Sequence, residues 1–241
     1  MSMLVMHDIH LSLGTAPVLD GVSLHLEKGE FVSILGPSGA GKSSLFRLLT
    51  GALAPDSGTI TLAGAPLDAT KRPFAFMPQR DALLPWARIL DNITLGLEVQ
   101  GMARNAARAH VLPMLPLFGL EGCEALYPSQ LSGGMRQRAA LLRTVVQDKP
   151  VQLLDEPFGA LDALTRLTMQ RWLKARWSQA RWTTLLVTHD VREAVALSTR
   201  IYVLSRKPAR VIHEAITEGR DPAVLETEIL DILLTQTGDN P

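Results

Sequence analysis

The residues whose types and spacing most clearly indicate chemistry form a glycine-rich octapeptide at positions 36–43. It reads Gly-Pro-Ser-Gly-Ala-Gly-Lys-Ser and directly follows the apolar run at 31–35. Glycine lacks a Cβ, so the backbone can turn tightly here and direct successive N–H groups toward an anion. A helix that begins near Lys42 adds the positive end of its dipole. This pattern, G-x-x-x-x-G-K-[ST] between a strand and a helix, predicts a site for nucleotide phosphates.

Two side chains of this phosphate loop have separate predicted roles. Lys42 can reach the β- and γ-phosphates of a nucleotide, and the Ser43 hydroxyl can ligate Mg²⁺. The alternative is a turn that only connects a strand to a helix, and eight matching residues with the right flanks argue against it. The residues predicted to bind the nucleotide in this segment are Gly36, Pro37, Ser38, Gly39, Ala40, Gly41, Lys42, Ser43 and Ser44.

A pair of carboxylates, Asp155 and Glu156, follows the apolar run at 151–154. Asp155 is predicted to hold Mg²⁺, and Glu156 to activate the water that attacks the γ-phosphate. Neighbouring residues of a strand face opposite sides, so the chain must curl here for both carboxylates to serve. Pro157 ends the strand and favours an extended conformation for Glu156. The alternative is an acidic turn without a function.

Gln79 and His189 also follow apolar runs, at 74–78 and 184–188. In an open parallel sheet, ligands bind beyond the carboxyl ends of the strands, so both side chains would line the edge that holds the phosphate loop. Gln79 could coordinate Mg²⁺ or orient water through its amide oxygen. His189 could donate a hydrogen bond to the γ-phosphate or the attacking water. Taken alone, each is more often a surface or structural residue.

A second glycine motif, Ser132-Gly133-Gly134, precedes the apolar helical pattern at 135–148. A serine hydroxyl and free N–H groups at a helix start form a potential anion site. Arg136 and Arg138 lie in the first turn, where the helix dipole disfavours cations, and a bound anion nearby would offset that cost. An ordinary helix N-terminus is the alternative.

The hydrophobic patterning predicts the elements that position these motifs. Period-two alternation at 3–11 and 22–28 is typical of half-buried strands. Between about 88 and 130 helical segments replace the strands, at about 91–100 and 103–117. From 135 onward helices and strands alternate, which implies a parallel sheet with helices on its faces. Residues 208–216 form a further strand or hairpin, and a last helix begins at Pro222 with Asp221 as its cap.

Composition limits the remaining classes. The chain has 24 basic and 24 acidic residues, so broad contact with a nucleic-acid backbone is not expected. One cysteine, Cys123, allows no internal disulfide and suggests a reducing compartment. No apolar run reaches the roughly 20 residues needed to cross a bilayer, and the first residues do not form a signal peptide. The mean hydropathy of +0.13 leaves room for an interface with another copy or with a membrane protein.

Along essentially its whole length, the chain resembles the ATP-binding subunits of ABC transporters. The loop at 36–43 is similar to the Walker A motif and residues 151–156 to Walker B. The other family motifs fall at Gln79 (Q-loop), 131–135 (signature, with Met135 where the family usually has glutamine), 159–162 (D-loop) and His189 (H-loop). The resemblance implies a P-loop NTPase fold: an α/β core with a mainly parallel sheet, an N-terminal antiparallel β subdomain and an inserted helical subdomain. One ABC ATPase domain would span 1–241, with the core in 1–87 and 150–241 and the helical subdomain in 88–149.

The resemblance also implies an assembly. Two copies would bind head to tail, each ATP lying between the phosphate loop of one and Ser132, Gly133 and Gly134 of the other. Glu156 would be the general base, His189 would hold the γ-phosphate, and Asp162 would signal across the dimer. Gln79 and the helical subdomain would contact an integral membrane permease at the cytoplasmic face of the inner membrane.

The segments 83–86, 155–166, 188–190 and 204–208 resemble the nitrate, sulfonate and taurine importer branch, which works with a separate solute-binding protein. Leu13 lies about where the family stacks adenine on an aromatic ring, so the contact with the base differs here. Two further hypotheses stay open, a nucleotide-gated mechanical module outside transport and a silent ATP-binding regulator. The sequence names neither the solute nor the role of residues 205–241, where a packed helix is the simple expectation.

Overall fold

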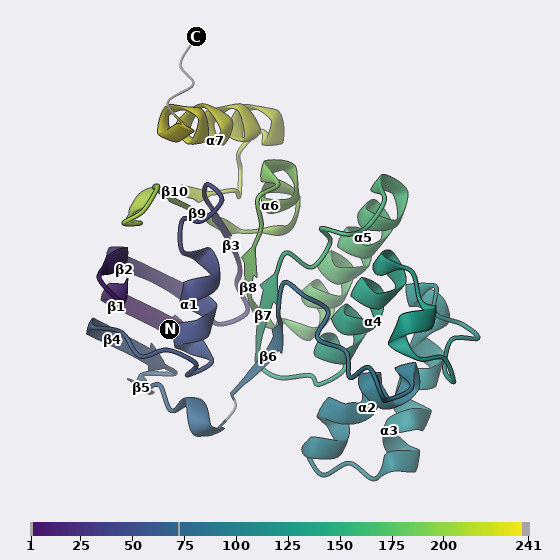
Figure 1. Cartoon of the computed structure of the whole chain (residues 1–241). Coiled ribbons are helices and arrows are strands. Elements are labelled where there is room, and N and C mark those ends of the chain that lie inside the picture. Colours follow the sequence, from purple (N-terminus) through teal and green to yellow (C-terminus); the bar gives the residue numbers. More distant parts are fainter. Residues whose placement is uncertain (1, 72, 238–241) are drawn as a thin grey trace.

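A six-stranded sheet lies at the centre of the fold in the computed structural model, which describes residues 2–71 and 73–237 (Figure 1). Its strand order is β10-β9-β3-β8-β7-β6. Neighbouring strands run parallel except β10, which pairs antiparallel with β9. The strands are β3 (Phe31–Leu35), β6 (Phe74–Met77), β7 (Val151–Asp155), β8 (Thr183–Val187), β9 (Arg200–Leu204) and β10 (Val211–Ile216). The predicted parallel sheet is therefore confirmed.

Strands β3, β7 and β8 are buried at every residue, because other elements cover both faces of the sheet. Helix α1 (Lys42–Leu49) covers one face, where its side chains share an apolar cluster with the N-terminal sheet. Helix α5 (Ala163–Ala180) and helix α4 (Gly133–Val145) contribute to the apolar cluster that includes Phe31, Met77 and Leu154. The carboxyl ends of the strands are thus left to carry the polar residues.

An antiparallel sheet of order β2-β1-β4-β5 forms the N-terminal part of the fold. Its strands are β1 (Ser2–Leu13), β2 (Ala16–Glu27), β4 (Ser57–Leu62) and β5 (Ala65–Pro66). The predicted antiparallel β portion is confirmed, and β2 begins six residues before the predicted 22, with register shifts in its pairing to β1. Those shifts accommodate Pro17 and Gly21 within the strand.

The helical segment comprises α2 (Ile89–Val99), α3 (Arg104–Val111) and α4, which lie together on one side of the molecule (Figure 1). The predicted helical segment at about 103–117 begins where expected, but its α-helix is shorter than the prediction. It ends at Val111, and two 3₁₀ turns follow at Leu112–Met114 and Pro116–Phe118. Pro113 and Pro116 cannot donate the backbone hydrogen bonds that a longer α-helix needs. The division of the chain at residues 88 and 149 stays a prediction.

The C-terminal segment packs against the sheet through α6 (Val191–Leu197) and α7 (Pro222–Thr237). Leu225 and Ile229 of α7 are buried against Val191 and Ala194 of α6. As predicted, Asp221 caps the last helix, accepting hydrogen bonds from the N–H groups of Ala223 and Val224 at 2.8 and 3.2 Å. The packed helix expected for this segment is present, but of the five side chains expected to be buried only Leu225 and Ile229 are, while Leu233 is partly buried and Val224 and Leu230 are exposed.

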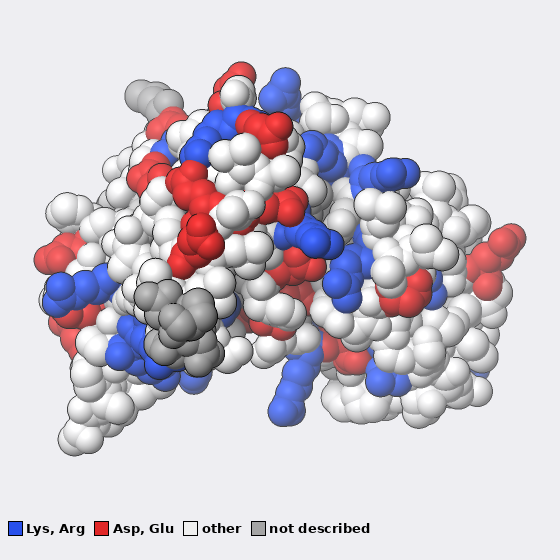
Figure 2. Space-filling model, turned by 90° about the horizontal axis from the view of Figure 1, so that it is seen from above, with Lys and Arg blue, Asp and Glu red and all other residues white. Residues whose placement is uncertain are grey.

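Two properties of the surface bear on the functional class. Across residues 2–71 and 73–237, every helix is too short or too polar to serve as a transmembrane span. On the face that Figure 2 shows, acidic and basic side chains are intermixed, in agreement with equal totals of 24 each.

Candidate functional site

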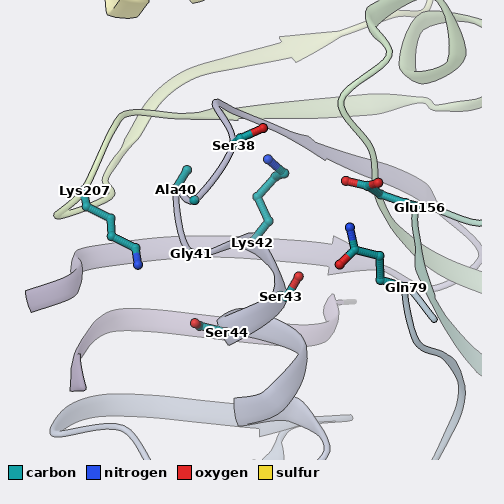
Figure 3. A pocket seen from close by; sticks show the side chains of 10 residues that line it. Ser38, Ala40, Gly41, Lys42, Ser43, Ser44, Gln79, Glu156 and Lys207 are labelled. Carbon is teal, nitrogen blue, oxygen red and sulfur yellow. The ribbon is translucent and has the colours of Figure 1, made fainter. Parts of the chain in front are cut away.

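A cavity of about 280 Å³ opens beyond the carboxyl ends of the parallel strands (Figure 3). Its lining joins segments that are far apart in the sequence, as the positions of the polar residues predict. In Figure 3, Glu156 and Gln79 lie at one end of this cavity and Lys207 at the other. The lining residues are Ser38, Gly39, Ala40, Gly41, Lys42, Ser43, Ser44, Gln79, Glu156 and Lys207.

The shape of the phosphate loop depends on Gly41. Its φ of 100° lies in the left-handed region that other residues rarely adopt, and α1 begins at the next residue. A Cβ at this position would come within 3.0 Å of side-chain carbons of Val18 and Leu19. Gly41 therefore lets the start of α1 lie against β2 with its first N–H groups open to the cavity.

The ammonium group of Lys42 is held inside the loop. Its Nζ donates hydrogen bonds to the carbonyl oxygens of Gly36 and Pro37 at 2.6 and 2.9 Å. Burial lowers the pKa of Lys42, and the carboxylates of Glu156 and Asp155 act in the opposite direction. The lysine is therefore a desolvated cation with exchangeable backbone partners, suited to an incoming phosphate.

Asp155 is buried at the end of β7. Burial raises the pKa of this carboxyl to about 6, while a hydrogen bond with Ser43 favours the ionised form. Its Oδ1 is a buried atom for which no hydrogen-bond partner exists among the described residues. An unpaired carboxylate oxygen beside a serine hydroxyl is a donor set that fits Mg²⁺, which prefers oxygen ligands. The amide of Gln79 points toward Ser43 across the cavity and could complete this set (Figure 3).

Glu156 adopts a left-handed conformation with φ of 49°, which corrects the extended conformation that Pro157 favours. Three hydrogen bonds hold this turn: the Glu156 N–H donates to Val187 O at 2.8 Å, and its carbonyl accepts from Gln137 Nε2 at 2.8 Å and from Gly159 N–H at 3.3 Å. The chain curls after Asp155, as the use of both carboxylates requires. The turn brings Glu156 Oε1 within 3.4 Å of His189 Nδ1.

Two positioning residues escaped the sequence analysis. Gln137 of α4 donates to Glu156 O and accepts from the Ala160 N–H at 3.3 Å, so it ties the helix to the segment after β7. Glu193 is 5% exposed and lies behind His189, where burial raises its pKa to about 7. Thr188 and Gln170 donate hydrogen bonds to Glu193, Asp190 is a like charge nearby, and Arg166 opposes it. Neither residue belongs to a motif that the spacing alone reveals.

Ser132, Gly133 and Gly134 lie at the N-terminus of α4 and are absent from the lining of the phosphate cavity. The Ser132 hydroxyl accepts a hydrogen bond from the Met135 N–H at 3.3 Å, while Ser132 and Gly133 are exposed. Gly134 lies against the 159–162 segment, because a Cβ there would be 3.4 Å from Ala160 O. Within one chain the two glycine motifs therefore form separate surfaces.

The charge of Arg136 is balanced inside the chain. Its Nε donates to Asp81 Oδ2 at 3.0 Å and its Nη1 to Leu131 O at 2.8 Å. A protein carboxylate thus offsets the unfavourable dipole, where a bound anion was the expected partner. Leu13, at the end of β1, is 40% exposed and is not among the lining residues, so its place in adenine binding stays a prediction.

Comparison with known sequences agrees with this geometry. The family model described as ABC transporter matches residues 19–159. The formylaminopyrimidine import ATP-binding protein ThiZ of Halalkalibacterium halodurans is 44% identical over 194 residues, covering 80% of this chain and 76% of its own length. The aliphatic sulfonates import ATP-binding protein SsuB of Pseudomonas fluorescens is 38% identical over 99% of this chain and 89% of its own. The taurine import ATP-binding protein TauB of Yersinia pestis is 42% identical over 81% and 77%.

Solved structures give the same result for the fold. The ATP-binding cassette MJ0796, captured as a dimer in a post-hydrolysis state with ADP and Pi, superposes with a TM-score of 0.82 at 29% identity. That comparison covers 90% of this chain and 100% of the cassette. A second dimeric structure of the bacterial ABC transporter cassette MJ0796 gives a TM-score of 0.81 at 30% identity.

Proposed function

Because this chain belongs to the ABC transporter family and is an ATPase of that family, we propose that it powers the import of a small solute through a separate membrane permease. The named relatives import aliphatic sulfonates, taurine and formylaminopyrimidine, so the proposed solute is a small sulfonate-like anion or an organic precursor. One observation carries the proposal: Lys42, Gln79 and Glu156 line one cavity with the phosphate loop, while the Ser132–Gly134 tip lies outside it with Ser132 and Gly133 exposed.

The phosphates of ATP would lie on the N–H groups of residues 38–44, at the positive end of α1. The Lys42 ammonium would exchange the carbonyls of Gly36 and Pro37 for the β- and γ-phosphate oxygens. Such charge-assisted hydrogen bonds are about twice as strong as those with neutral carbonyls, which favours the exchange.

Ser43, Asp155 and Gln79 would hold Mg²⁺, which neutralises charge on the β- and γ-phosphates when it is bound. The unpaired Oδ1 of Asp155 supports this assignment, because a buried carboxylate oxygen without a partner is costly unless a cation or donor completes it.

Glu156 would act as the general base. Its carboxylate would take a proton from a water molecule while the water oxygen bonds to the γ-phosphorus and the bond to the ADP oxygen breaks. His189, 3.4 Å from Glu156, would orient the γ-phosphate and the water. The left-handed turn that aims Glu156 is held in place by Gln137 and Val187.

Two copies would bind head to tail, with the tip of one closing the cavity of the other. The exposed serine hydroxyl and helix N-terminus at 132–134 supply N–H groups for the γ-phosphate of the partner. Gln137 and Gly134 contact the 159–162 segment at Ala160. Asp162 of this segment would signal ATP hydrolysis to the other copy across the interface. A dimer of this kind makes ATP the link between the two copies.

The segment after Gln79 would transmit the closing and opening of the two copies to the permease. Arg143 of α4 donates to Asp81 O and to Ala82 O at 2.7 Å, and Asn92 of α2 binds the backbone of Leu84 and Ala87. Trp86 in this segment is 74% exposed, and Val99 at the end of α2 is 62% exposed. These apolar side chains would dock on the permease at the cytoplasmic face of the inner membrane, and a separate solute-binding protein would deliver the solute.

The proposal is tested by the steady-state ATPase rate of the purified chain and of Glu156→Gln. The variant is expected to bind ATP and to lose turnover by about a hundredfold to ten-thousandfold, the usual contribution of a general base. Near-normal turnover in Glu156→Gln would contradict the assignment of the base. An unaltered wild-type chain that hydrolyses no ATP would contradict the enzymatic proposal itself.

A further inference from the structure

Lys207 is a second lysine of the phosphate cavity that the family motifs leave without a role. It lies in the connection between β9 and β10, more than 160 residues after the phosphate loop, and it lines the same cavity as Lys42. Figure 3 shows its side chain beyond Ala40 and Gly41, at the end opposite to Glu156 and Gln79. Its backbone thus brings a cation to the far end of the nucleotide site.

The loop that carries Lys207 is anchored on both sides of the phosphate loop. Before it, Leu204 lies against Gly36, where a Cβ would come within 3.1 Å of Leu204 atoms. After it, the Ala209 N–H donates to Val18 O at 2.9 Å, and Ala209 O accepts from the Asp20 N–H at 2.9 Å. Val18 in turn touches the position of Gly41. The lysine is therefore fixed relative to the loop at its base, while its side chain stays exposed.

The charges around Lys207 indicate an anionic ligand. No ion pair joins Lys207 to a carboxylate within residues 2–71 and 73–237, although the neighbouring Arg210 pairs with Asp20. Lys207 shares the cavity with a second cation, Lys42, and with one carboxylate, Glu156, at the opposite end. With two lysines against one carboxylate, the charged side chains that line this cavity carry a net positive charge, which favours an anion within it.

We propose that Lys207 binds the α-phosphate end of the nucleotide, beside Ser44. This inference rests on the proposed ATP site and extends it. Glu156, Gln79 and Ser43 define the γ-phosphate and magnesium end, so the opposite end of the cavity receives the α-phosphate and the nucleoside. The contact gives the chain an electrostatic interaction with the nucleotide at the end of the cavity away from Glu156.

The test is equilibrium binding of ADP to the full chain, measured by titration calorimetry at low salt. Lys207→Gln is expected to weaken ADP binding by about fivefold to twentyfold, the usual range for one exposed charge-assisted hydrogen bond. Lys207→Arg keeps the charge and is expected to bind ADP like the wild type. Lys28→Gln is the matched control, because Lys28 is an exposed lysine outside this cavity.

Binding of ATP, measured in a Glu156→Gln background, locates the contact. If Lys207 contacts the α-phosphate, its replacement by glutamine should weaken the binding of ATP and of ADP by the same factor, because both nucleotides carry that phosphate. Weakening confined to ATP would overturn the proposal, since it would place Lys207 at the γ-phosphate. Unchanged ADP binding in Lys207→Gln, or a change equal to that of Lys28→Gln, would also overturn it.

The variant Lys42→Ala separates the proposal of a nucleotide site from the proposal that Lys207 contacts the nucleotide. Suppose that the wild-type chain binds ADP, that Lys42→Ala weakens ADP binding and that Lys207→Gln leaves it unchanged. Only the proposed role of Lys207 would then be rejected. If the wild-type chain binds neither ADP nor ATP, the proposed nucleotide site falls together with it. Equal unfolding midpoints of Lys207→Gln and wild type exclude a folding defect as the cause of weaker binding.

Discussion

The phosphate cavity and the Ser132–Gly134 tip are both glycine motifs at helix N-termini, yet their surroundings differ. The cavity brings together residues from four separate segments, and the Lys42 side chain that points into it is only 7% exposed. At the tip, Ser132 and Gly133 are exposed, and the nearby carboxylate of Asp81 already pairs with Arg136. One motif is built to hold a ligand within the chain, and the other presents donors to something outside it.

This difference explains why a single chain forms only half of the proposed ATP site. The two halves are nevertheless connected, since Gln137 joins the helix of the tip to the turn that aims Glu156. A ligand that bridges two copies would therefore act on the base and on the tip at once. The predictions below test whether the two regions divide binding and turnover in this way.

The largest expected contrast is between Lys42→Ala and Ser132→Arg. Lys42→Ala should weaken ADP binding by about tenfold to hundredfold, because the charged partner of the phosphates is lost. Ser132→Arg should leave ADP binding within about twofold, since the tip lies outside the cavity, but lower ATP turnover by about a hundredfold, the usual cost of one lost oxyanion donor. Calorimetry and a coupled ATPase assay measure the two effects.

Ser178→Arg is the control for the tip variant, because Ser178 is an exposed serine on α5. Its turnover should equal that of the wild type. If Ser132→Arg weakened ADP binding as much as Lys42→Ala, the two motifs would belong to one site within the chain, and the comparison would fail.

The buried charges of the cavity side predict a pH dependence of stability. Burial raises the pKa of Glu193 to about 7 from an ordinary value of 4.5, so the unfolded chain gives up this proton at a lower pH than the folded chain. The stabilisation is fully present below about pH 4.5 and is lost as the pH rises through 7, amounting to about 3 kcal/mol in the free energy of unfolding. Glu193→Gln should therefore lose less stability than the wild type between pH 5 and pH 8.

Urea unfolding at several pH values measures this difference. Asp155 adds a slope of the same sign, and it cancels in the comparison because both proteins contain it. Glu218→Gln, a change at an exposed carboxylate, should keep the wild-type slope. If the free energy of unfolding changed with pH in the same way for Glu193→Gln and the wild type, ionisation of Glu193 would not destabilise the folded chain, which would contradict the prediction.

The smallest effect on turnover is expected for Gln137, which connects the helix of the tip with the turn at Glu156. Gln137→Ala removes two hydrogen bonds and leaves the Ala160 N–H without its partner, which should cost about 2 kcal/mol of stability. Turnover should fall several-fold with little change in the KM for ATP, because the aim of Glu156 is disturbed while the phosphate loop is intact. Gln100→Ala, which loses one exposed amide hydrogen bond, is the matched control. A higher KM with unchanged kcat would contradict the positioning role.

Local signals in the sequence were sufficient for the strands, the phosphate loop and the order of the motifs. The apolar runs before Gln79, Asp155 and His189 predicted that polar side chains meet at one sheet edge, because parallel strands bring their carboxyl ends together. The helical segment predicted at about 103–117 runs through Pro113 and Pro116, and these prolines explain why its α-helix ends at Val111.

Residues that act through tertiary contacts could not be found in this way. Gln137 and Glu193 carry no pattern of their own, and the resemblance at 204–208 does not predict that Lys207 lines the phosphate cavity; the positions of all three depend on how distant elements pack. The left-handed turn of Glu156 is of the same kind. The local preference set by Pro157 is overridden by two hydrogen bonds to other elements: the Glu156 N–H donates to the Val187 carbonyl, and the Glu156 carbonyl accepts from Gln137.

The most direct test of the shared site is a cross-link between two chains of different tag length, both carrying Glu156→Gln. One chain carries Ser38→Cys in the phosphate loop and the other carries Ser132→Cys at the tip, and the native Cys123 is buried in both. With ATP present, mild oxidation should give a covalent product that contains one chain of each kind, and it should give little of it without nucleotide. No mixed product in the presence of ATP, or the same yield in its absence, would contradict the claim that ATP is held between two copies.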